Sequence, residues 1–270
     1  MSFKRILIRV HSLASELFGV DLLKTLAGLS GLPAFFRGLA KFRDGYCGKF
    51  VFNPYSGDRY KGGVSTKNEY FWQDLLVAQR IFQDQPSRHV DVGSRIDGFV
   101  AHVANFRHID VFNMRLVTSD IPGVVFKQAN LMFADSVGAL SNGGKGYCDS
   151  LSCLHAIEHF GLGRYGDPVD PLGYRRGIEN RSRLLLPGGR LYLSNPIGSE
   201  RVEYNANWVF DPNTILGVAN AAGLRFDELT VLHQQGGHKT VLRPSADQLN
   251  ALVKEHYRLG IFHFIKESGK

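Results

Sequence analysis

The chain has 270 residues and a net charge of +7, with 44% hydrophobic and 21% charged residues, as in an ordinary globular protein with a full core. Its three cysteines form no CxxC pair, which argues against a disulfide framework and a structural zinc site. The positive charge indicates an acidic partner, such as a phosphorylated sugar or a membrane surface, but no nucleic-acid-binding signature accompanies it.

The first part of the chain, residues 1–68, is expected to be a helical segment followed by a loop-rich connector. Apolar residues recur at helical spacing over residues 1–44, with a break predicted at Gly31–Leu32–Pro33. Basic side chains outnumber acidic ones there, so this segment is either a helical cap on the main domain or a peripheral contact with a membrane. No signal peptide or run of ~20 apolar residues is present, so we expect a cytoplasmic protein, in the second case at the inner face of the membrane.

Residues 69–270 are expected to form one α/β domain. A helix is predicted over 69–82, and from residue 89 onward short apolar runs alternate with helical patterns. The expected strands are 89–93, 108–116, 124–131, 147–154, 190–194, 224–233 and 259–266, and the expected helices are 96–106, 173–186 and 211–222. A turn is predicted at 187–189, and Asp211 is predicted to cap the last helix. The alternation predicts a mostly parallel sheet with helices on both faces.

The first strand is followed by a tight turn and a helix, in the sequence HVDVGSRIDGF (89–99). Gly93 would let a ligand approach the backbone, and the helix start offers free N–H groups. The spacing is neither GxGxxG nor GxxxxGK[ST], which disfavours a dinucleotide site and a P-loop.

The most informative segment is residues 150–167, SLSCLHAIEHFGLGRYGD. An apolar strand ends there in a group of titratable residues separated by glycines: His155, Glu158, His159, Arg164 and Asp167. In open α/β sheets ligands bind beyond the carboxyl ends of the strands, so this group is a candidate active site.

Two interpretations of the histidines differ in their chemistry. His155, Glu158 and His159 match the HxxEH pattern of inverted zinc proteases, but that site needs a continuous helix and a further ligand. The favoured chemical interpretation is that His155 or His159, with a pKa near 7, accepts a proton from a substrate hydroxyl. The alternative without chemistry is that each histidine is structural and is hydrogen-bonded to hold the loop.

Further polar residues are candidates for substrate binding. Arg164 suits a phosphate or carboxylate, or else pairs with Asp167 to stiffen the loop, and Tyr165 either stacks on a sugar or packs. Asn195 follows the fifth strand, and His238 lies near the expected last hairpin.

Four motifs give the chain a resemblance to known proteins: DVGSRIDGF (91–99), SLSCLHAIEHFGLGRYGDP (150–168), LLLPGGRLYLSNPIG (184–198) and ERVEYNANWVFDP (200–212). Over about residues 69–235 the chain resembles a class I S-adenosylmethionine-dependent methyltransferase, and within that group the bacterial family of domain of unknown function 268. The resemblance implies a Rossmann-like sheet of seven strands with the last strand antiparallel. It also implies that Asp91, Gly93 and Ser94 hold the methionine part of the cofactor.

The chain departs from the methyltransferase pattern at two positions. Asn113 stands where an acidic residue usually binds the ribose, and Asn130 stands where one usually binds the adenine. At roughly 1 kcal/mol per hydrogen bond, two neutral amides in place of carboxylates weaken cofactor binding by about 30-fold.

The expected function is transfer of a methyl group from S-adenosylmethionine to a sugar hydroxyl, on a nucleotide sugar or a growing surface polysaccharide. Two alternatives remain open at this point: a binding or regulatory module that has lost its cofactor, and a transferase that uses a nucleotide sugar as donor. A divalent metal on Asp167 or Asp170 is compatible with the sequence but not required by it. The sequence does not determine the oligomeric state.

Overall fold

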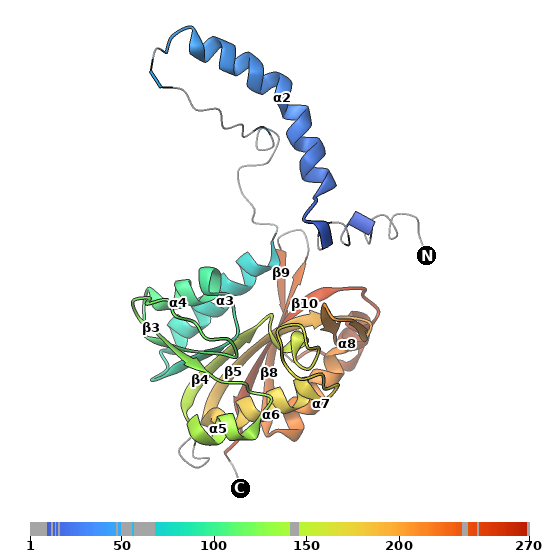
Figure 1. Ribbon diagram of the computed structural model, residues 1–270. Coiled ribbons are helices and arrows are strands. Elements are labelled where there is room, and N and C mark those ends of the chain that lie inside the picture. Colours follow the sequence, from blue (N-terminus) through green and yellow to red (C-terminus); the bar gives the residue numbers. More distant parts are fainter. Residues whose placement is uncertain are drawn as a thin grey trace. The chain divides into compact units, whose positions relative to one another are not determined.

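The protein was analysed as a computed structural model (Figure 1). The structure describes residues 10, 11, 13, 15, 17–46, 48, 49, 56, 68–140, 146–233, 237–241 and 243–268, of which Leu22, His233 and 237–241 are described by their backbone alone. The chain divides into two compact units, Met1–Ser65 and Thr66–Lys270, which are described separately.

In the first unit the main described element is helix α2, Leu22–Arg43. Asp21 caps it by accepting a hydrogen bond from the backbone N–H of Lys24 at 3.0 Å. The break expected at residues 31–33 is wrong, because α2 continues through Pro33. Proline removes only one hydrogen bond of the helix, and the leucines and alanines on either side are strong helix formers. None of the helices in the described part of the chain is long and apolar enough to span a membrane.

The second unit contains all the strands that the structure describes. They are β1 (His89–Val92), β2 (Ile109–Asn113), β3 (Val124–Gln128), β4 (Cys148–Leu154), β5 (Leu185–Ile197), β6 (Arg201–Glu203), β7 (Asn207–Val209), β8 (Leu224–His233), β9 (Gly237–Val241) and β10 (Arg258–Lys266). The helical elements are α3 (Glu69–Asp84), η1 (Ile96–Val100), α4 (Ala101–Ala104), α5 (Ala134–Leu140), η2 (Ile157–His159), α6 (Gly173–Leu184), α7 (Pro212–Ala221) and α8 (Ala246–Val253).

The main sheet has the strand order β3-β2-β1-β4-β5-β10-β8-β9. The first five strands pair in parallel, and β10 inserts antiparallel between β5 and β8. The expected seven-stranded, mostly parallel sheet is therefore confirmed, with its last strand antiparallel. Strand β9, which was not expected, extends it by pairing antiparallel with β8. The short strands β6 and β7 form a separate hairpin.

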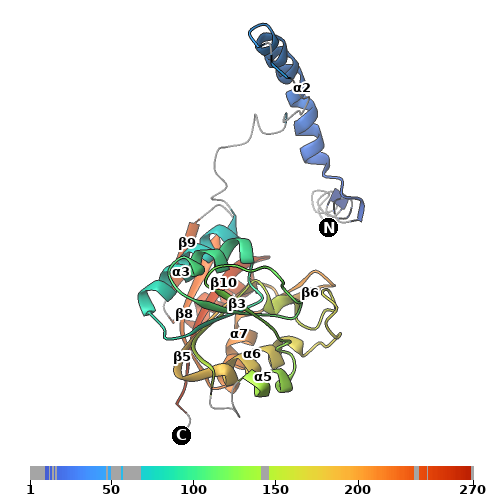
Figure 2. The same ribbon diagram turned by 60° about the vertical axis from the view of Figure 1, so that its left-hand side comes forward.

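Helices cover both faces of the sheet, as expected (Figures 1 and 2). Helices α3 and α4 lie on one face, where Ile81 and Phe99 are part of a buried cluster. Helices α5, α6 and α7 lie on the other face, where Ile178 and Ile215 are part of the larger cluster. The carboxyl ends of the parallel strands remain open at the edge of the sheet between these layers.

Several local expectations differ from the structure. The helix expected over 96–106 is a π-helical turn, η1, followed by the short helix α4. The turn expected at 187–189 lies within β5, where the pairing of β4 with β5 shifts register between Cys148 and Ser150. Here the glycines form a bulge in a longer strand rather than a separate turn. The N-cap of α7 is confirmed, since Asp211 accepts a hydrogen bond from the N–H of Asn213 at 2.8 Å.

Candidate functional site

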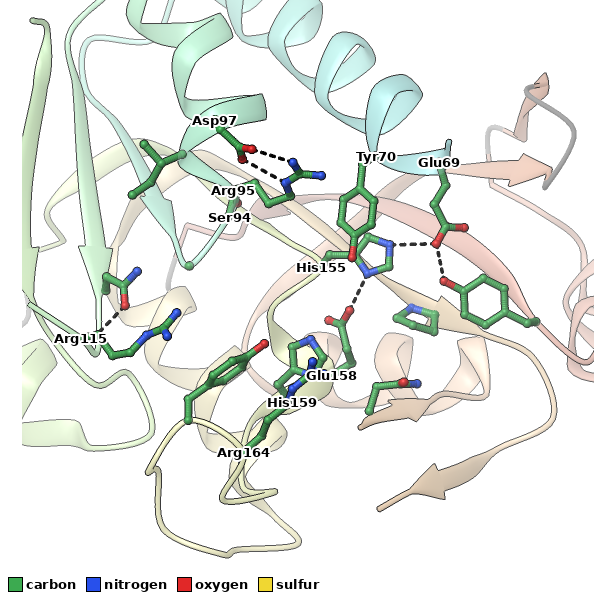
Figure 3. Close-up of a pocket in the computed structure, with 17 residues that line it drawn as sticks. Glu69, Tyr70, Ser94, Arg95, Asp97, Arg115, His155, Glu158, His159 and Arg164 are labelled. Carbon is green, nitrogen blue, oxygen red and sulfur yellow. Dashed lines mark hydrogen bonds and ion pairs between the residues drawn. The ribbon is translucent and has the colours of Figure 1, made fainter. Parts of the chain in front are cut away.

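Two adjoining cavities lie beyond the carboxyl ends of β1, β2 and β4. The larger has a volume of about 620 Å³ and is shown in Figure 3, and the smaller has a volume of about 130 Å³. The residues that line both cavities are Gly93, Asn113, Arg115, His155, His159 and Tyr165. Because six residues are common to both, the two cavities form one site with a narrow compartment and a wide one.

The turn after β1 forms one wall of the site. Asp91 is fully buried and accepts hydrogen bonds from the N–H and hydroxyl of Ser94 and from the hydroxyl of Ser152. Burial raises the pKa of Asp91 to about 6. Asp91 lines neither cavity, whereas Gly93 lines both and Ser94 lines the larger one. Asp91 therefore holds the turn in shape, and the turn faces the ligand through the backbone of Gly93.

Gly93 occupies the left-handed region with φ +76°. A Cβ atom there would lie 3.2 Å from the Cβ of Ala156 and would enter the region where the two cavities meet. Glycine therefore both permits this turn and keeps the wall of the site open.

The two asparagines at the ends of β2 and β3 face the narrow compartment. Asn113 lines both cavities, and its Oδ1 accepts a hydrogen bond from the N–H of Arg115 at 2.9 Å. Asn130 lines the smaller cavity, and its Oδ1 accepts one from the N–H of Met132 at 3.0 Å. Each amide oxygen is thus used by the protein backbone, while each amide group retains N–H donors near the cavity.

His155 lies between two carboxylates (Figure 3). Its Nδ1 donates to Oε1 of the buried Glu158 at 2.6 Å, and its Nε2 forms an ion pair with Oε1 of Glu69 at 3.5 Å. The hydroxyl of Tyr257 donates to the same Glu69 oxygen at 2.6 Å. The backbone of His155 has φ +51°, and its N–H donates to the carbonyl and hydroxyl oxygens of Ser194. A non-glycine residue held in this region indicates a site whose surroundings fix its geometry.

These contacts fix the charge of His155. Burial opposes the charged ring, but the carboxylates of Glu158 and Glu69 outweigh it and raise the pKa of His155 to about 9. The ring of Tyr70 packs on the imidazole with centroids 4.5 Å apart, and burial raises the pKa of its phenol to about 12. His155 is therefore an imidazolium at neutral pH, and the expectation that it has a pKa near 7 is wrong.

His159 has the opposite properties. Its Nδ1 lies 2.7 Å from the carbonyl oxygen of Ala206, in the turn between β6 and β7, and must donate to it. Burial lowers the pKa of His159, so the ring is neutral at pH 7. Its Nε2 has no hydrogen-bond partner among the described residues, and the ring lines both cavities. Of the two histidines, His159 has the properties of a general base.

The continuous helix that the zinc interpretation requires is not formed around the two histidines. His155 has a left-handed backbone, and only Ile157–His159 form a short 3-10 turn, so the two rings do not lie one helical turn apart on one face. Within the described residues no group of three or more His, Cys, Asp or Glu side chains could hold a metal ion. Asp170, one of the two expected metal ligands, instead forms an ion pair with Arg176.

The loop after η2 is stabilised by hydrogen bonds between its own residues. The carboxylate of Asp167 accepts hydrogen bonds from the N–H groups of Gly161, Gly163 and Tyr165. Arg164 does not pair with Asp167 but donates to the carbonyl of Ala206 at 2.9 Å. Arg164 lines the larger cavity, Asp167 lines the smaller and Tyr165 lines both. Asp167 is thus a structural residue of the loop, and Arg164 is available to the wide compartment.

Of two further predicted substrate-binding residues, one lies outside the cavity walls and the side chain of the other falls outside the described residues. Asn195 is fully buried in β5, donates to the carbonyl of Pro196 at 3.0 Å and lines neither cavity. His238 belongs to β9, where the side chains are outside the described residues.

Several residues that line the larger cavity were not predicted from the sequence: Glu69, Tyr70, Arg95, Arg115 and Tyr257. Arg115 follows β2 by two residues, so the rule that ligands bind beyond strand ends would have identified it. Glu69 and Tyr70 begin α3 behind the cap Asn68, and no local pattern marks them as part of a site.

Comparison with known families gives a partial match. Residues 139–218 match the model of domain of unknown function 268, which is described as a Caenorhabditis protein of unknown function. The expected description of this family as bacterial is therefore not supported. The match covers β4, η2 and α6, and so includes His155, which follows β4, and His159, which lies in η2. Among curated proteins no sequence matches this chain.

Solved structures share the fold. The [4+2]-cyclase SpnF has 16% identity and a TM-score of 0.50, with 73% of this chain and 80% of that chain covered. A S-adenosylmethionine-dependent methyltransferase from Thermotoga maritima has 12% identity and a TM-score of 0.50, with 75% and 91% covered. One of these proteins is named a methyltransferase and the other a cyclase, so the fold does not by itself determine the reaction. The second unit of this chain has the Rossmann-like fold of class I methyltransferases.

Proposed function

We propose that this protein transfers a methyl group from S-adenosylmethionine to a sugar hydroxyl, on a nucleotide sugar or a surface polysaccharide. The observation that carries the proposal is the position of His159, whose ring lines both compartments of one site and whose Nε2 has no partner among the residues that the structure describes. A base in this position reaches a donor bound in the narrow compartment and an acceptor bound in the wide one.

The residues of the narrow compartment fit the cofactor. The open wall at Gly93 suits the methionine part, and the amides of Asn113 and Asn130 suit the ribose and the adenine. The apolar side chains of Phe112, Met114 and Leu131 complete a slot for a flat ring. When bound, the cofactor supplies a sulfonium methyl group, whose bond to sulfur breaks as a bond to the acceptor oxygen forms.

His159 would remove the proton of the acceptor hydroxyl as this oxygen takes the methyl group. A hydroxyl is a weak nucleophile at neutral pH, and a neutral imidazole with a free Nε2 is a suitable base for it. The proton moves to Nε2, and the resulting imidazolium keeps its Nδ1–H on the carbonyl of Ala206. The positive charge therefore moves from the donor sulfur to this ring, and the total charge is unchanged.

His155 has a different role in this proposal. As an imidazolium between Glu158 and Glu69 it fixes both carboxylates on the wall of the wide compartment. Carboxylate oxygens accept hydrogen bonds from sugar hydroxyls, and the ring of Tyr257, which lines the same cavity, provides a flat surface on which a sugar packs. This wall therefore suits a carbohydrate acceptor and would orient its hydroxyl toward His159.

A calorimetric titration with S-adenosylhomocysteine tests the donor half of the proposal. We expect binding in the micromolar range and a loss of at least about tenfold in Met114→Trp, which fills the slot. Leu116→Trp is the matched control, because Leu116 is 71% exposed and lines neither cavity. Absence of binding at millimolar ligand would contradict the proposal and favour a module without cofactor or a nucleotide-sugar transferase.

A further inference from the structure

The wall of the wide compartment contains a buried carboxylate oxygen that none of the described residues satisfies. Glu158 is 1% exposed, and while its Oε1 accepts from His155, its Oε2 has no hydrogen-bond partner in the described structure. A buried carboxylate oxygen without a donor lowers stability, so the negative charge of Glu158 is held in this wall at a free-energy cost. Together with Glu69, this part of the wall attracts donors and repels anions.

The arginines of the same cavity are not equivalent. Arg95 forms two hydrogen bonds with the carboxylate of Asp97, the shorter at 2.8 Å, so its charge is compensated. Arg115 and Arg164 have no carboxylate within 4.0 Å among the residues that the structure describes. The cavity therefore has two guanidinium groups whose charge an anionic ligand would compensate.

Both uncompensated arginines pack against one aromatic ring. The guanidinium carbon of Arg115 lies 5.0 Å from the ring centroid of Tyr165, and that of Arg164 lies 5.3 Å from it. A guanidinium that rests on a ring keeps its N–H edges for hydrogen bonds to a ligand. The arginines come from different places, the end of β2 and the loop after η2, and converge on Tyr165.

This cationic pair adjoins the proposed base. The ring of His159 is in edge contact with Tyr165 at 5.5 Å between centroids, and Arg164 donates to the carbonyl that also binds His159. Figure 3 shows Arg115 across the cavity from Glu69 and Tyr70. An acceptor that lies across this cavity would thus have a hydroxyl-bearing part at the carboxylates and an anionic part at the guanidinium groups.

We infer that Arg115 and Arg164 form a phosphate-binding subsite of the wide compartment, so that the acceptor is a sugar carrying a phosphate or diphosphate group rather than a neutral polysaccharide. This inference rests on the proposed function and narrows its acceptor. Planar guanidinium groups bind phosphate oxygens through paired N–H donors, and the partly exposed carboxylate of Glu69 accepts a hydrogen bond from a hydroxyl of the sugar.

The test is calorimetric titration of the full chain with inorganic pyrophosphate and, separately, with inorganic phosphate. We expect pyrophosphate to bind, and to bind at least about tenfold more weakly to Arg115→Gln and to Arg164→Gln. Arg225→Gln removes the same charge from β8, outside both cavities, and should leave the affinity unchanged. Tighter binding of pyrophosphate than of phosphate supports a diphosphate-linked sugar, and equal binding supports a monophosphate.

Each titration is repeated in saturating S-adenosylhomocysteine to separate this inference from the proposed function. Unchanged pyrophosphate affinity supports an acceptor subsite, whereas competition would assign the arginines to the cofactor and overturn the inference. Equal affinity in Arg115→Gln, Arg164→Gln and the control would also overturn it. If pyrophosphate binds at the two arginines but S-adenosylhomocysteine does not bind, the subsite stands and the methyltransferase proposal fails.

Discussion

His159 and the carbonyl oxygen of Ala206, 2.7 Å apart, determine which nitrogen of the imidazole is available for chemistry. A carbonyl only accepts, so Nδ1 carries the hydrogen and Nε2 carries the lone pair whenever the ring is neutral. Ala206 lies in the turn of the hairpin formed by β6 and β7, which are remote in sequence from η2. The hairpin thus sets the tautomer of the proposed base.

Replacing His159 by Gln should abolish most of the methyl transfer and preserve the fold. Gln keeps a donor for Ala206 but has no basic nitrogen, so we expect the rate to fall by about 10²–10⁴-fold. The measurement is methyl transfer from S-adenosylmethionine to a phosphorylated sugar acceptor, with S-adenosylhomocysteine affinity measured alongside. A rate within threefold of the wild type, at unchanged affinity, would remove His159 from the proposed mechanism.

The pH dependence of the rate distinguishes His159 from His155. Burial lowers the pKa of His159, so the base is active at neutral pH and the rate should fall only as the pH drops below about 6.5. The pKa of His155 is raised to about 9, so a base at that position would give a rate that rises up to pH 9. The position of the acid limb in a pH–rate profile therefore decides between them.

The ion pair of His155 with Glu158 should be visible in the pH dependence of stability. Its folded pKa of about 9 exceeds the ordinary value of 6.5, so its contribution is fully present below pH 6.5 and is lost as the pH rises through 9. Glu158→Gln removes the main attraction, so the NMR titration of His155 should shift to lower pH. Glu203→Gln, at an exposed position of β6, is the control and should leave that titration unchanged.

Much of the fold could be predicted from the sequence because most core strands and helices carry a recognisable pattern within their own residues. Strands β8 and β10 follow apolar runs, and the Asp211–Pro212 pair marks the start of α7 unambiguously. The break expected at Pro33 was wrong because an interior proline removes one hydrogen bond of a helix without ending it where the residues on either side stay helical. Strand β9 was missed because its partner β8, and not its own composition, determines that it is a strand.

The candidate site could be predicted from the sequence only where titratable residues directly follow the end of a strand. His155, Glu158 and His159 follow β4 directly, so their place in the site could be inferred from sequence. Their opposite protonation could not, because it depends on Glu69 from α3 and Ala206 from the hairpin, each remote from η2 in sequence. Tertiary neighbours of this kind leave no local pattern in the sequence.

Restoring a carboxylate at residue 113 should strengthen cofactor binding. Asn113→Asp keeps the side-chain oxygen that accepts from Arg115 N–H and adds a charged acceptor for a ribose hydroxyl. At roughly 1 kcal/mol for this difference, we expect S-adenosylhomocysteine to bind about fivefold more tightly. Asn105→Asp, at an exposed position after α4, is the control and should leave the affinity unchanged. Weaker binding in Asn113→Asp would mean that the ribose does not lie at the end of β2.

The loop that carries Arg164 and Tyr165 offers a matched pair of glycines for testing its geometry. Gly161 and Gly166 both have left-handed backbones, with φ +81° and +83°. A Cβ at Gly161 would lie 1.9 Å from the carbonyl oxygen of Asp170, whereas a Cβ at Gly166 meets no atom within 4 Å.

Gly166→Ala should therefore lower the free energy of unfolding by only about 1–2 kcal/mol, the cost of the left-handed backbone. Gly161→Ala adds a backbone clash, which raises the expected loss to about 3–5 kcal/mol. Urea denaturation measures both values, and pyrophosphate titration of the folded variants measures the subsite. Because the clash displaces the loop that carries Arg164, Gly161→Ala should also weaken pyrophosphate binding, while Gly166→Ala should retain it. Equal unfolding free energies in the two variants would mean that the loop does not lie against Asp170. The position of this loop, and with it the contact of both arginines with Tyr165, would then be contradicted.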